Sequence, residues 1–296
     1  MKSGTVMDLV VGATGILGGA ICRLLREKGR PVRALVRETS DPAKLAALVE
    51  AGVETVVGDL KDPASLRDAC RDVGAVLSTA SSTLSRTDGD SIDSVDLQGQ
   101  TALVAAARDA GVGHVVYVSF PPDPAGFPLQ DAKRAVEDRI RSSGLPWTIL
   151  HPTHFREVWL GPALGFDPAQ GRARVFGEGL GPIRWVAVAD VAAAAVAALD
   201  NPQALGRTFE LGGPESLSLA EVIDRMEALS GTRLERDVVP LENLHAMLSG
   251  EDPLLRSFAA LMLACARHGC AIDSTEAERV LGFRPSPLSD HLRGLV

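Results

Sequence analysis

The stretch Val10-Val11-Gly12-Ala13-Thr14-Gly15-Ile16-Leu17-Gly18-Gly19 decides the fold of this chain. Residues 9–11 are apolar and predict a short buried strand, and apolar residues at helical spacing from Ile16 to Leu25 predict a helix. The glycines let the chain leave the strand sharply, approach a phosphate and pack helix against strand. Because the free N–H groups and positive dipole end of such a helix attract anions, the turn predicts a dinucleotide site.

Strands and helices are expected to alternate along the rest of the first two thirds of the chain. Further strands are expected at residues 31–36, 53–57, 75–77, 115–119, 147–150 and 208–211. Helices are expected at residues 44–50, 63–71, 95–110, 129–142 and 190–199, with Asp62 and Asp190 as caps. This alternation predicts an α/β fold with a doubly wound parallel Rossmann sheet, whose ligand lies at the carboxyl ends of the strands.

The regular alternation loosens after residue 152, where Gly-Pro and Asp-Pro pairs mark loops. We expect residues 1–152 and 186–213 to form an NADP-binding Rossmann domain. Residues 153–185 and 214–296 are expected to form a smaller, discontinuous C-terminal substrate lobe, with helices at 217–230 and after Pro240.

The composition excludes several classes of protein. A hydrophobic fraction of 46% and a charged fraction of 23% are typical of a soluble globular protein. The net charge of −8 and the 4% aromatic content argue against nucleic-acid binding. No leader and no apolar run long enough for a membrane span occur, so a cytoplasmic protein without a membrane partner is expected, as a monomer or homodimer.

The four cysteines are scattered along the chain, and reduced thiols are the expected state. Cys265, His268 and Cys270 could supply three metal ligands, but no fourth ligand completes the set. We therefore expect these residues to pack, and we expect no metal.

The choice between NADP and NAD depends on the end of the second strand. An acidic residue there accepts a ribose 2′-hydroxyl, whereas a 2′-phosphate needs a cation. Arg37 stands about 20 residues after the last glycine of the turn, and a guanidinium can pair two phosphate oxygens. NADP(H) is therefore the expected cofactor. The adjacent Glu38 keeps NAD open, and Arg37 as a solvated surface charge is the remaining alternative.

Several separated motifs resemble the NmrA-like branch of the atypical short-chain dehydrogenases/reductases. They are residues 12–18 (GATGILG), 32–37 (VRALVR), 58–60 (GDL), 117–119 (YVS) and 144–150 (GLPWTIL). This branch contains isoflavone-reductase-like enzymes, quinone reductases and a non-catalytic redox sensor. The resemblance runs from about residue 10 to residue 211 and is weak in the C-terminal lobe.

The resemblance implies a cofactor site, residue by residue. Gly12, Thr14, Gly15, Ile16 and Leu17 would hold the pyrophosphate, and Arg37 would hold the 2′-phosphate. Asp59 and Leu60 would border the adenine, Ala80 and Ser81 would line the path to the nicotinamide, and Pro152 and Thr153 would flank its ring. Asp59 has an alternative role as the cap of the following helix.

The resemblance also implies candidates for catalysis, Ser119 and Lys133. In the parent superfamily a serine at this strand end is followed by Tyr-x-x-x-Lys, but the tyrosine position here holds Leu129. The only tyrosine, Tyr117, is expected to pack within its strand. Lys133 could bind the nicotinamide ribose or supply a proton. Alternatively, it forms an exposed pair with Glu137, one turn later.

His151 and His154 follow the sixth strand, where the nicotinamide is expected. Imidazole titrates near neutrality, so either residue could donate a proton, although a structural role is the alternative for both. His154, Phe155 and Trp159 are candidates for binding substrate, and Trp185 could add to an apolar wall.

Two functions are compatible with these residues. The first is an NADPH-dependent reductase that transfers hydride to an apolar carbonyl, quinone or enone. The second, favoured by the missing tyrosine, is a non-catalytic NADP(H)-binding redox sensor that acts through a protein partner.

Overall fold

The central element is a seven-stranded, fully parallel sheet, seen in a computed structural model that describes residues 6–83 and 87–296. The strand order is β3-β2-β1-β4-β5-β6-β9. The strands are β1 (Met7–Val11), β2 (Val32–Val36), β3 (Glu54–Val57), β4 (Val73–Ser78), β5 (His114–Val118), β6 (Trp147–Pro152) and β9 (Arg207–Leu211). The direction of the crossovers reverses between β1 and β4, which is where ligands bind in sheets of this kind. The predicted doubly wound Rossmann sheet is confirmed.

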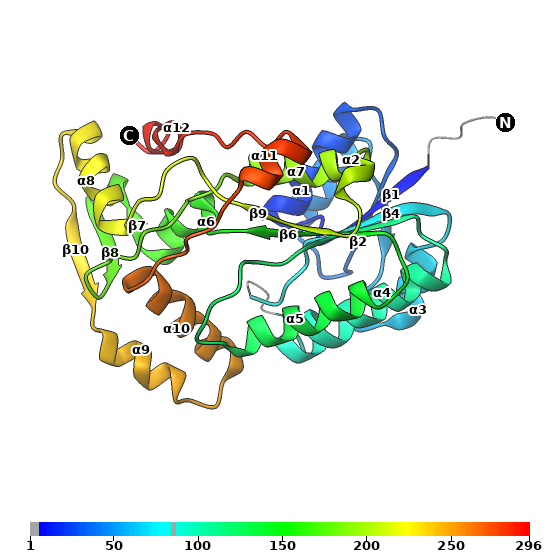
Figure 1. The fold of residues 1–296 in the computed structure, drawn as a ribbon, viewed down its shortest axis with the longest axis horizontal. Helices are drawn as coiled ribbons and strands as arrows, with labels where there is room; N and C mark the ends of the chain where they lie inside the picture. The colour runs from blue at the N-terminus through cyan, green and yellow to red at the C-terminus, as the bar shows by residue number, and fades with distance from the viewer. Residues whose placement is uncertain (1–5, 84–86) are drawn as a thin grey trace.

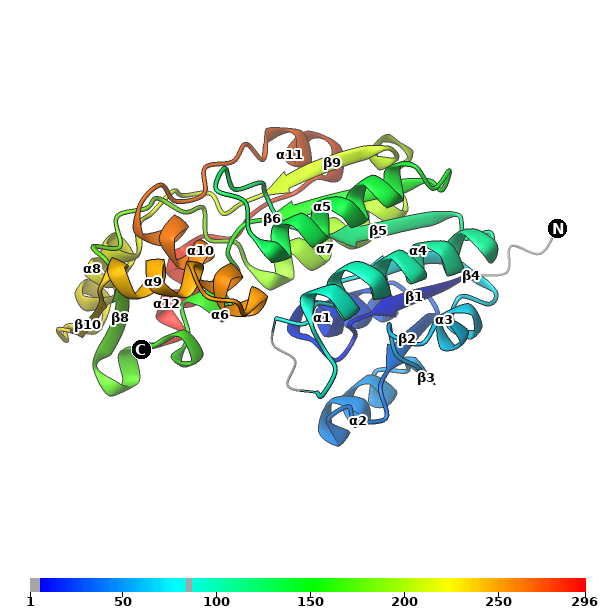
Figure 2. The same cartoon turned by 90° about the horizontal axis from the view of Figure 1, so that it is seen from below.

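Helices cover both faces of this sheet (Figures 1 and 2). On one face lie α1 (Ile16–Glu27), α2 (Pro42–Glu50), α7 (Val188–Leu199) and α11 (Thr275–Leu281). On the other lie α3 (Pro63–Ala69), α4 (Gln100–Asp109) and α5 (Pro128–Arg141). Side chains alternate between the two cores along each strand, so Val116 packs on the α1 side and Tyr117 on the α5 side. Both faces are thus covered, as a parallel sheet requires.

The segment before α4 differs from its prediction. The sequence predicted one α-helix over 95–110, whereas residues Ile92–Gly99 form the π-helix η1 and α4 begins only at Gln100. Two tertiary contacts accompany this wider turn. Asp96 is fully buried and accepts a hydrogen bond from the Ser82 amide at 3.0 Å, and a side chain at Gly99 would meet the Cβ of Leu60 at 2.8 Å. Helical periodicity contains no information about these contacts, so the π-helix was missed.

The predicted helix caps had different outcomes. Asp62 caps α3 by accepting a hydrogen bond from the Ala64 amide at 2.9 Å, as predicted. Asp190 does not cap α7, because that helix begins two residues earlier, at Val188. Its carboxylate instead accepts hydrogen bonds from the amide and hydroxyl of Ser286, at 2.8 and 2.7 Å. Asp190 therefore joins the C-terminal segment, at Ser286, to α7, which packs on the first sheet.

A second, three-stranded sheet lies beyond β6, with strand order β10-β8-β7 (Figure 1). Its strands are β7 (Phe166–Asp167), β8 (Arg172–Phe176) and β10 (Glu235–Val239). None was predicted, because they are short or alternate weakly. The helices around them are α6 (Arg156–Trp159), α8 (Leu219–Ser230), α9 (Leu241–Leu248), α10 (Pro253–Ala266) and α12 (Leu288–Arg293). This part of the chain has two buried clusters of its own.

The chain returns to the first sheet near its C-terminus. The core that contains α1 and α7 also includes four residues from this segment: Ala277, Val280, Leu281 and Phe283. The predicted boundaries assigned these residues to the smaller lobe. Among the described residues, no helix is long and apolar enough to cross a membrane.

Candidate functional site

The β1–α1 turn exposes backbone amides at the carboxyl edge of the sheet. Gly12 has a φ of +89°, and a side chain there would meet the backbone nitrogen of Ala80 at 2.8 Å. A Cβ at Gly18 would lie 2.2 Å from the Gly12 carbonyl oxygen, so α1 packs directly on the turn. At Gly15, by contrast, the same Cβ would meet only the Gly12 oxygen, at 3.2 Å. The turn is therefore closed toward the protein and open toward solvent.

The N-terminus of α1 carries no side chain that satisfies its amides. Gly15 is the N-cap and makes no side-chain hydrogen bond, and the first turn has no acidic residue. The first helical hydrogen bond runs from the Gly19 amide to the Gly15 carbonyl, so the amides of residues 16–18 have no partner within the helix. Gly15 and Ile16 are exposed here, Thr14 is partly buried, and Leu17 is buried. These amides fit a pyrophosphate.

Arg37 follows β2 and lies in an ion cluster with Lys61 and Asp90. Its guanidinium Nη1 is 2.6 Å from Asp90 Oδ2, and the Lys61 ammonium contacts the other oxygen of that carboxylate. Arg37 is therefore not a solvated surface charge. Glu38 is exposed and stands outside the cluster. The sequence indicated neither Lys61 nor Asp90, because the chain brings them to Arg37 from the loop after β3 and from the segment before η1.

The residues expected near the adenine lie beside this cluster. Asp59 accepts a hydrogen bond from the Lys61 amide at 2.8 Å in the turn before α3, and the cap of α3 is Asp62. The alternative role of Asp59 as that cap is therefore wrong. Leu60 is buried against the α3–α5 core.

Ala80 and Ser81 follow β4, next to the β1–α1 turn. The Ala80 carbonyl accepts a hydrogen bond from the Gln100 side chain at 2.9 Å. The Ser81 hydroxyl lies 3.4 Å from both the hydroxyl and the amide nitrogen of Thr83. Since Gly12 abuts the Ala80 backbone, β4 and the glycine turn share one edge of the site.

Lys133 is buried on α5, beside the carboxyl end of β5. Its ammonium lies 3.4 Å from the Val118 carbonyl oxygen and 5.2 Å from the centroid of the Tyr117 ring. Burial lowers the pKa of this ammonium, and the charges of Asp96 and Glu137 oppose that shift. The alternative of an exposed Lys133–Glu137 pair is wrong, because both side chains are buried.

Tyr117 is a packing residue, as expected. It is almost fully buried, and burial raises the pKa of its phenol well above the ordinary value. Its hydroxyl completes no hydrogen bond within the described chain. Leu129, at the position of the absent tyrosine, is also buried, and its amide bonds to the Ser257 hydroxyl of α10.

His151 lies in a second, buried ion cluster with Glu137 and Arg134. Its Nε2 is 2.9 Å from Glu137 Oε1 and 2.9 Å from Arg134 Nη1, and Glu137 also pairs with both Arg134 and Arg141. The nitrogen can donate to the carboxylate or accept from the guanidinium, but not both. In either case Nε2 is engaged inside the protein.

The carboxyl group of Glu137 stays ionised in this environment. Burial alone would raise its pKa, but hydrogen bonds from His151 and the charges of His151 and Arg134 lower the pKa to about 2. The buried Ser119 hydroxyl lies close enough to add to this lowering of the Glu137 pKa, although it completes no hydrogen bond of standard geometry. Ser119 therefore lies beside the Glu137 cluster, at the end of β5.

Pro152 and Thr153 lie at the carboxyl end of β6. The Thr153 amide donates to the Leu211 carbonyl of β9 at 2.9 Å, and its hydroxyl donates to the Arg184 carbonyl. Thr153 thus joins the first sheet to the segment that leads into the second lobe.

His154 packs against two tryptophans. Its ring lies edge-on to Trp159 with centroids 4.2 Å apart, and 5.8 Å from Trp185. Burial lowers the pKa of His154 to about 4, and its Nε2 has no hydrogen-bond partner within the described residues. The imidazole is therefore neutral near pH 7.

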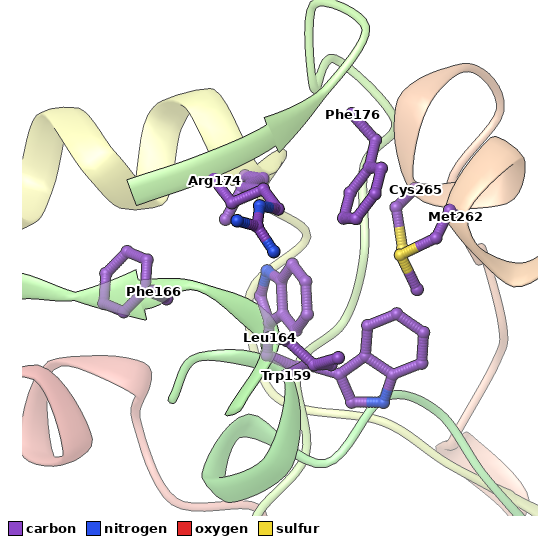
Figure 3. A pocket seen from close by; sticks show the side chains of 9 residues that line it. Trp159, Leu164, Phe166, Arg174, Phe176, Met262 and Cys265 are labelled. Atoms are coloured by element: carbon purple, nitrogen blue, oxygen red, sulfur yellow. The ribbon is translucent and has the colours of Figure 1, made fainter. Parts of the chain in front are cut away.

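Trp159 and Trp185 line a cavity in the smaller lobe, which Figure 3 shows with Phe166, Phe176 and Met262 around it. Its volume is about 20 Å³, which is room for a single water. Phe155 packs instead against the α1–α7 core and pairs with Val186. The three aromatic residues expected to form one apolar wall are thus divided between two cores.

The predicted packing role of the Cys265–Cys270 segment agrees with the structure. Cys265 is buried, burial raises the pKa of both thiols, and His268 is 2.9 Å from a carboxylate oxygen of Asp123. Within the ranges 6–83 and 87–296, no three His, Cys, Asp or Glu residues are grouped as metal ligands would be.

The sequence-predicted residues thus form two neighbouring parts of one edge. The first part surrounds the ends of β1, β2 and β4 and consists of Gly12–Leu17, Arg37, Asp59 and Ala80. The second part lies at the ends of β5 and β6 and consists of Ser119, Lys133 and His151. Sequence reasoning missed Lys61, Asp90, Asp96 and Arg134. A basic residue just after the 58–60 motif and an acidic residue inside an apolar helical face were the available signals for Lys61 and Asp96.

The fold and this edge define the class of protein: an α/β protein with the architecture of dinucleotide-binding domains. The model of the NmrA-like family matches residues 5–290, so the chain belongs to the NmrA-like family. The resemblance read from the separated motifs is confirmed.

Several named relatives are reductases. An NAD(P)H azoreductase of Xenophilus azovorans is 32% identical over 82% of this chain and 81% of its own length. The photosystem II assembly factor Ycf39 of Synechocystis is 31% identical over 81% of this chain and 73% of its own length. Sequence relatives therefore include an oxidoreductase and a protein named for assembly.

Solved structures of reductases have the same fold. A triphenylmethane reductase of Citrobacter, complexed with NADP(H), superposes with a TM-score of 0.78, at 24% identity over 98% of this chain and 100% of that one. An NADPH-dependent quinone oxidoreductase of Escherichia coli, complexed with NADPH, gives a TM-score of 0.75, at 24% identity over 98% and 99% of the two chains. These two likenesses show a shared fold, and a nicotinamide cofactor, as the sequence predicts, agrees with the NAD(P)H azoreductase relative.

Proposed function

We propose that this protein is an NADPH-dependent reductase of the atypical short-chain dehydrogenase type, which reduces an apolar carbonyl, quinone or enone compound. The observation that carries the proposal is the open β1–α1 turn with two cations, Arg37 and Lys61, at the end of the neighbouring strands. The NAD(P)H azoreductase relative supports the same activity.

The residues of the turn would bind the cofactor through its phosphates. The amides of residues 16–18 face a pyrophosphate, and Gly12, Thr14, Gly15, Ile16 and Leu17 surround it. Arg37 holds the 2′-phosphate, while Asp59 and Leu60 border the adenine. Ala80, Ser81, Pro152 and Thr153 line the course of the nicotinamide half, across the ends of β4 and β6. NADPH, when bound, supplies a hydride.

Lys133 is the proton source that we propose for the reduced substrate. Its ammonium is buried at the end of β5, where burial lowers its pKa and so eases the release of a proton. His151 is a weaker candidate, since its Nε2 is held by Glu137 and Arg134. We propose that His151 and Ser119 are positioning residues, which hold the ionised Glu137 of α5 at the ends of β5 and β6.

The substrate would enter from the side of the smaller lobe, residues 153–185 and 214–296. His154 and Trp159 supply a neutral imidazole and an indole there, and Phe155 lies at the junction with the first domain. The cavity beside Trp159 has room for only one water, so a ring-sized substrate requires the side chains around it to move.

Substitution of Lys133 tests the reductase. In K133M, we expect the rate of NADPH oxidation with a panel of quinones and enones to fall at least about 100-fold, as for loss of an acid–base group. Titration calorimetry should still detect NADPH binding. The matched control is K28M at an exposed lysine at the end of α1, which should leave both unchanged. Turnover retained by K133M would refute the role of Lys133.

The alternative function is a redox sensor that binds NADP(H) without turnover and acts through a protein partner. The buried Leu129 in place of an acidic phenol favours it, as does the relative named as an assembly factor. Tight NADPH binding by the wild type, with no oxidation by any compound of the panel, would replace the reductase by this function. The cytoplasmic location and the oligomeric state stay predictions.

A further inference from the structure

The Arg37–Lys61–Asp90 cluster contains a carboxylate, Asp90, in addition to two cations that suit a 2′-phosphate. The two oxygens of the Asp90 carboxylate are divided between the two cations, with Arg37 Nη1 at 2.6 Å from Oδ2 and the Lys61 ammonium on Oδ1. The three residues come from the end of β2, the loop after β3 and the segment before η1. They meet only in the folded protein.

The exposure of the three side chains differs sharply. The Asp90 side chain is only 3% exposed, whereas Arg37 is 38% and Lys61 28% exposed. The carboxylate therefore lies beneath two cations that still reach solvent. Arg37 uses one of its five N–H groups on Asp90, and a guanidinium can bind a second anion with the others.

Arg37, Lys61, Asp90 and Asp59 together carry no net charge. Arg37 and Lys61 contribute two positive charges, and Asp90 with Asp59, 3.7 Å from the Lys61 ammonium, contributes two negative charges. A phosphate group with a charge near −2 gains little from a neutral cluster and more from one with a net positive charge. Asp90 therefore weakens the contact that Arg37 and Lys61 would make with a 2′-phosphate.

We propose that Asp90 is a specificity-determining residue that limits the preference for NADPH over NADH, and that Lys61 is the second cation at the 2′-phosphate. The inference rests on the proposed cofactor site. When the ribose carries a 2′-hydroxyl, Asp90 and Asp59 together neutralise the two cations. When it carries a phosphate, that group shares them with Asp90 and is bound less tightly than the two cations would allow.

Two ligands that differ only in the 2′-phosphate test this directly: adenosine 2′,5′-bisphosphate and adenosine 5′-monophosphate. Removing one negative charge about 6 Å from a phosphate changes its binding constant about tenfold in a high-dielectric environment. In D90N, calorimetry should therefore show about tenfold tighter binding of the bisphosphate and less than twofold change for the monophosphate. Asparagine has nearly the same shape and keeps one oxygen that can accept from Arg37, while the charge and the oxygen that faces Lys61 are removed.

Lys61→Met should weaken the bisphosphate about tenfold and leave the monophosphate unchanged. The matched control is D88N, which removes the same charge at an exposed acid two residues from Asp90. It should alter neither affinity by more than twofold. Thermal melts of each variant establish that it is folded before titration.

Weaker bisphosphate binding in D90N would overturn the inference and make Asp90 a residue that only orients Arg37. An equal change for both ligands, or none, would also overturn it. Failure of the wild type to bind NADPH and both adenosine ligands would instead refute the proposed function. The two failures are distinguishable. The inference about Asp90 fails on the ratio of bisphosphate to monophosphate affinity in D90N, whereas the proposed function fails if the wild type binds none of these ligands.

Discussion

The carboxyl ends of β1 and β2 present bare backbone amides and half-exposed cations, whereas the ends of β5 and β6 bury a histidine, a glutamate and a lysine. The first region is organised by glycines within a few residues of one another. The second is assembled from side chains on β5, α5 and β6 that are up to 32 residues apart, from Ser119 to His151. An uncapped helix N-terminus therefore arises locally, while a buried charge network requires several elements to be in place.

This difference predicts different sensitivities to mutation. A change in the first region should act on phosphate binding through backbone shape, since few side chains there carry the site. A change in the second should act on stability first, because an ion left without its partner in the interior is costly. Three variants test the comparison.

The largest effect is expected for Gly18→Ala. The added Cβ would lie 2.2 Å from the Gly12 carbonyl oxygen and force α1 away from the turn. We expect the free energy of unfolding to fall by about 3 kcal/mol and NADPH binding to be lost. Urea unfolding and calorimetry measure the two effects.

Gly29→Ala is the matched control at the other end of α1. Gly29 has a φ of +72° but no atom within 4 Å of an added Cβ. The substitution should cost about 1 kcal/mol through its backbone conformation alone, with NADPH affinity unchanged. Equal losses in both variants would contradict the special role of the β1–α1 turn.

Glu137→Gln tests the second region through the dependence of stability on pH. The folded-state pKa of Glu137, about 2, lies below the ordinary value of 4.5, so its ionisation stabilises the protein above about pH 4.5. That contribution is lost as the pH falls from about 4.5 toward 2. We expect E137Q to be roughly 3 kcal/mol less stable at pH 7, with the gap to the wild type narrowing below pH 4.5.

Asp138→Asn is the control for that variant. Asp138 is the next residue on α5, 78% exposed, and pairs with Arg141 at the surface. Its loss should cost less than about 0.5 kcal/mol. A gap between E137Q and the wild type that stays constant down to pH 2 would show that the cluster is not the source of the effect.

The smallest effect is expected for Asp62→Ala, which removes the cap of α3 next to the nucleotide edge. Loss of its hydrogen bond to the Ala64 amide should cost about 1 kcal/mol in thermal or urea unfolding. Asp68→Ala, at an exposed partner of Arg71 on the same helix, should cost less than about 0.5 kcal/mol. If the two variants lost the same stability, the cap would contribute no more than a surface ion pair.

The sequence predicted the parts of the site that depend on short-range patterns. The glycine turn, the strands of the first sheet and the cap at Asp62 each follow from residues within one strand or one helical turn. Arg37 was found because its distance from the glycines is set by the length of α1 and β2. The only acid that the sequence analysis weighed here was the adjacent Glu38, which kept NAD open, whereas the acid that contacts Arg37 is Asp90, 53 residues later.

Other features could not be predicted, for the same reason. The π-helix at Ile92–Gly99 accompanies the burial of Asp96 against Ser82, and the contact of Asp190 with Ser286 joins residues 96 positions apart. Helical spacing put Lys133 and Glu137 on one face of α5, and this was compatible with an exposed pair. Only the packing of α5 against β5 and β6 buries them both.

By itself, the sequence determined the parallel sheet, the family and the glycine turn between β1 and α1, because periodicity and glycine geometry act within a few residues. Tertiary structure alone decided which charges meet. Asp90 lies between Arg37 and Lys61, and His151 lies against Glu137 and Arg134, because crossovers of the chain bring distant strand ends to one edge of the sheet. Coulomb and hydrogen-bond energies depend on the distances between these side chains, and a local sequence pattern cannot predict those distances.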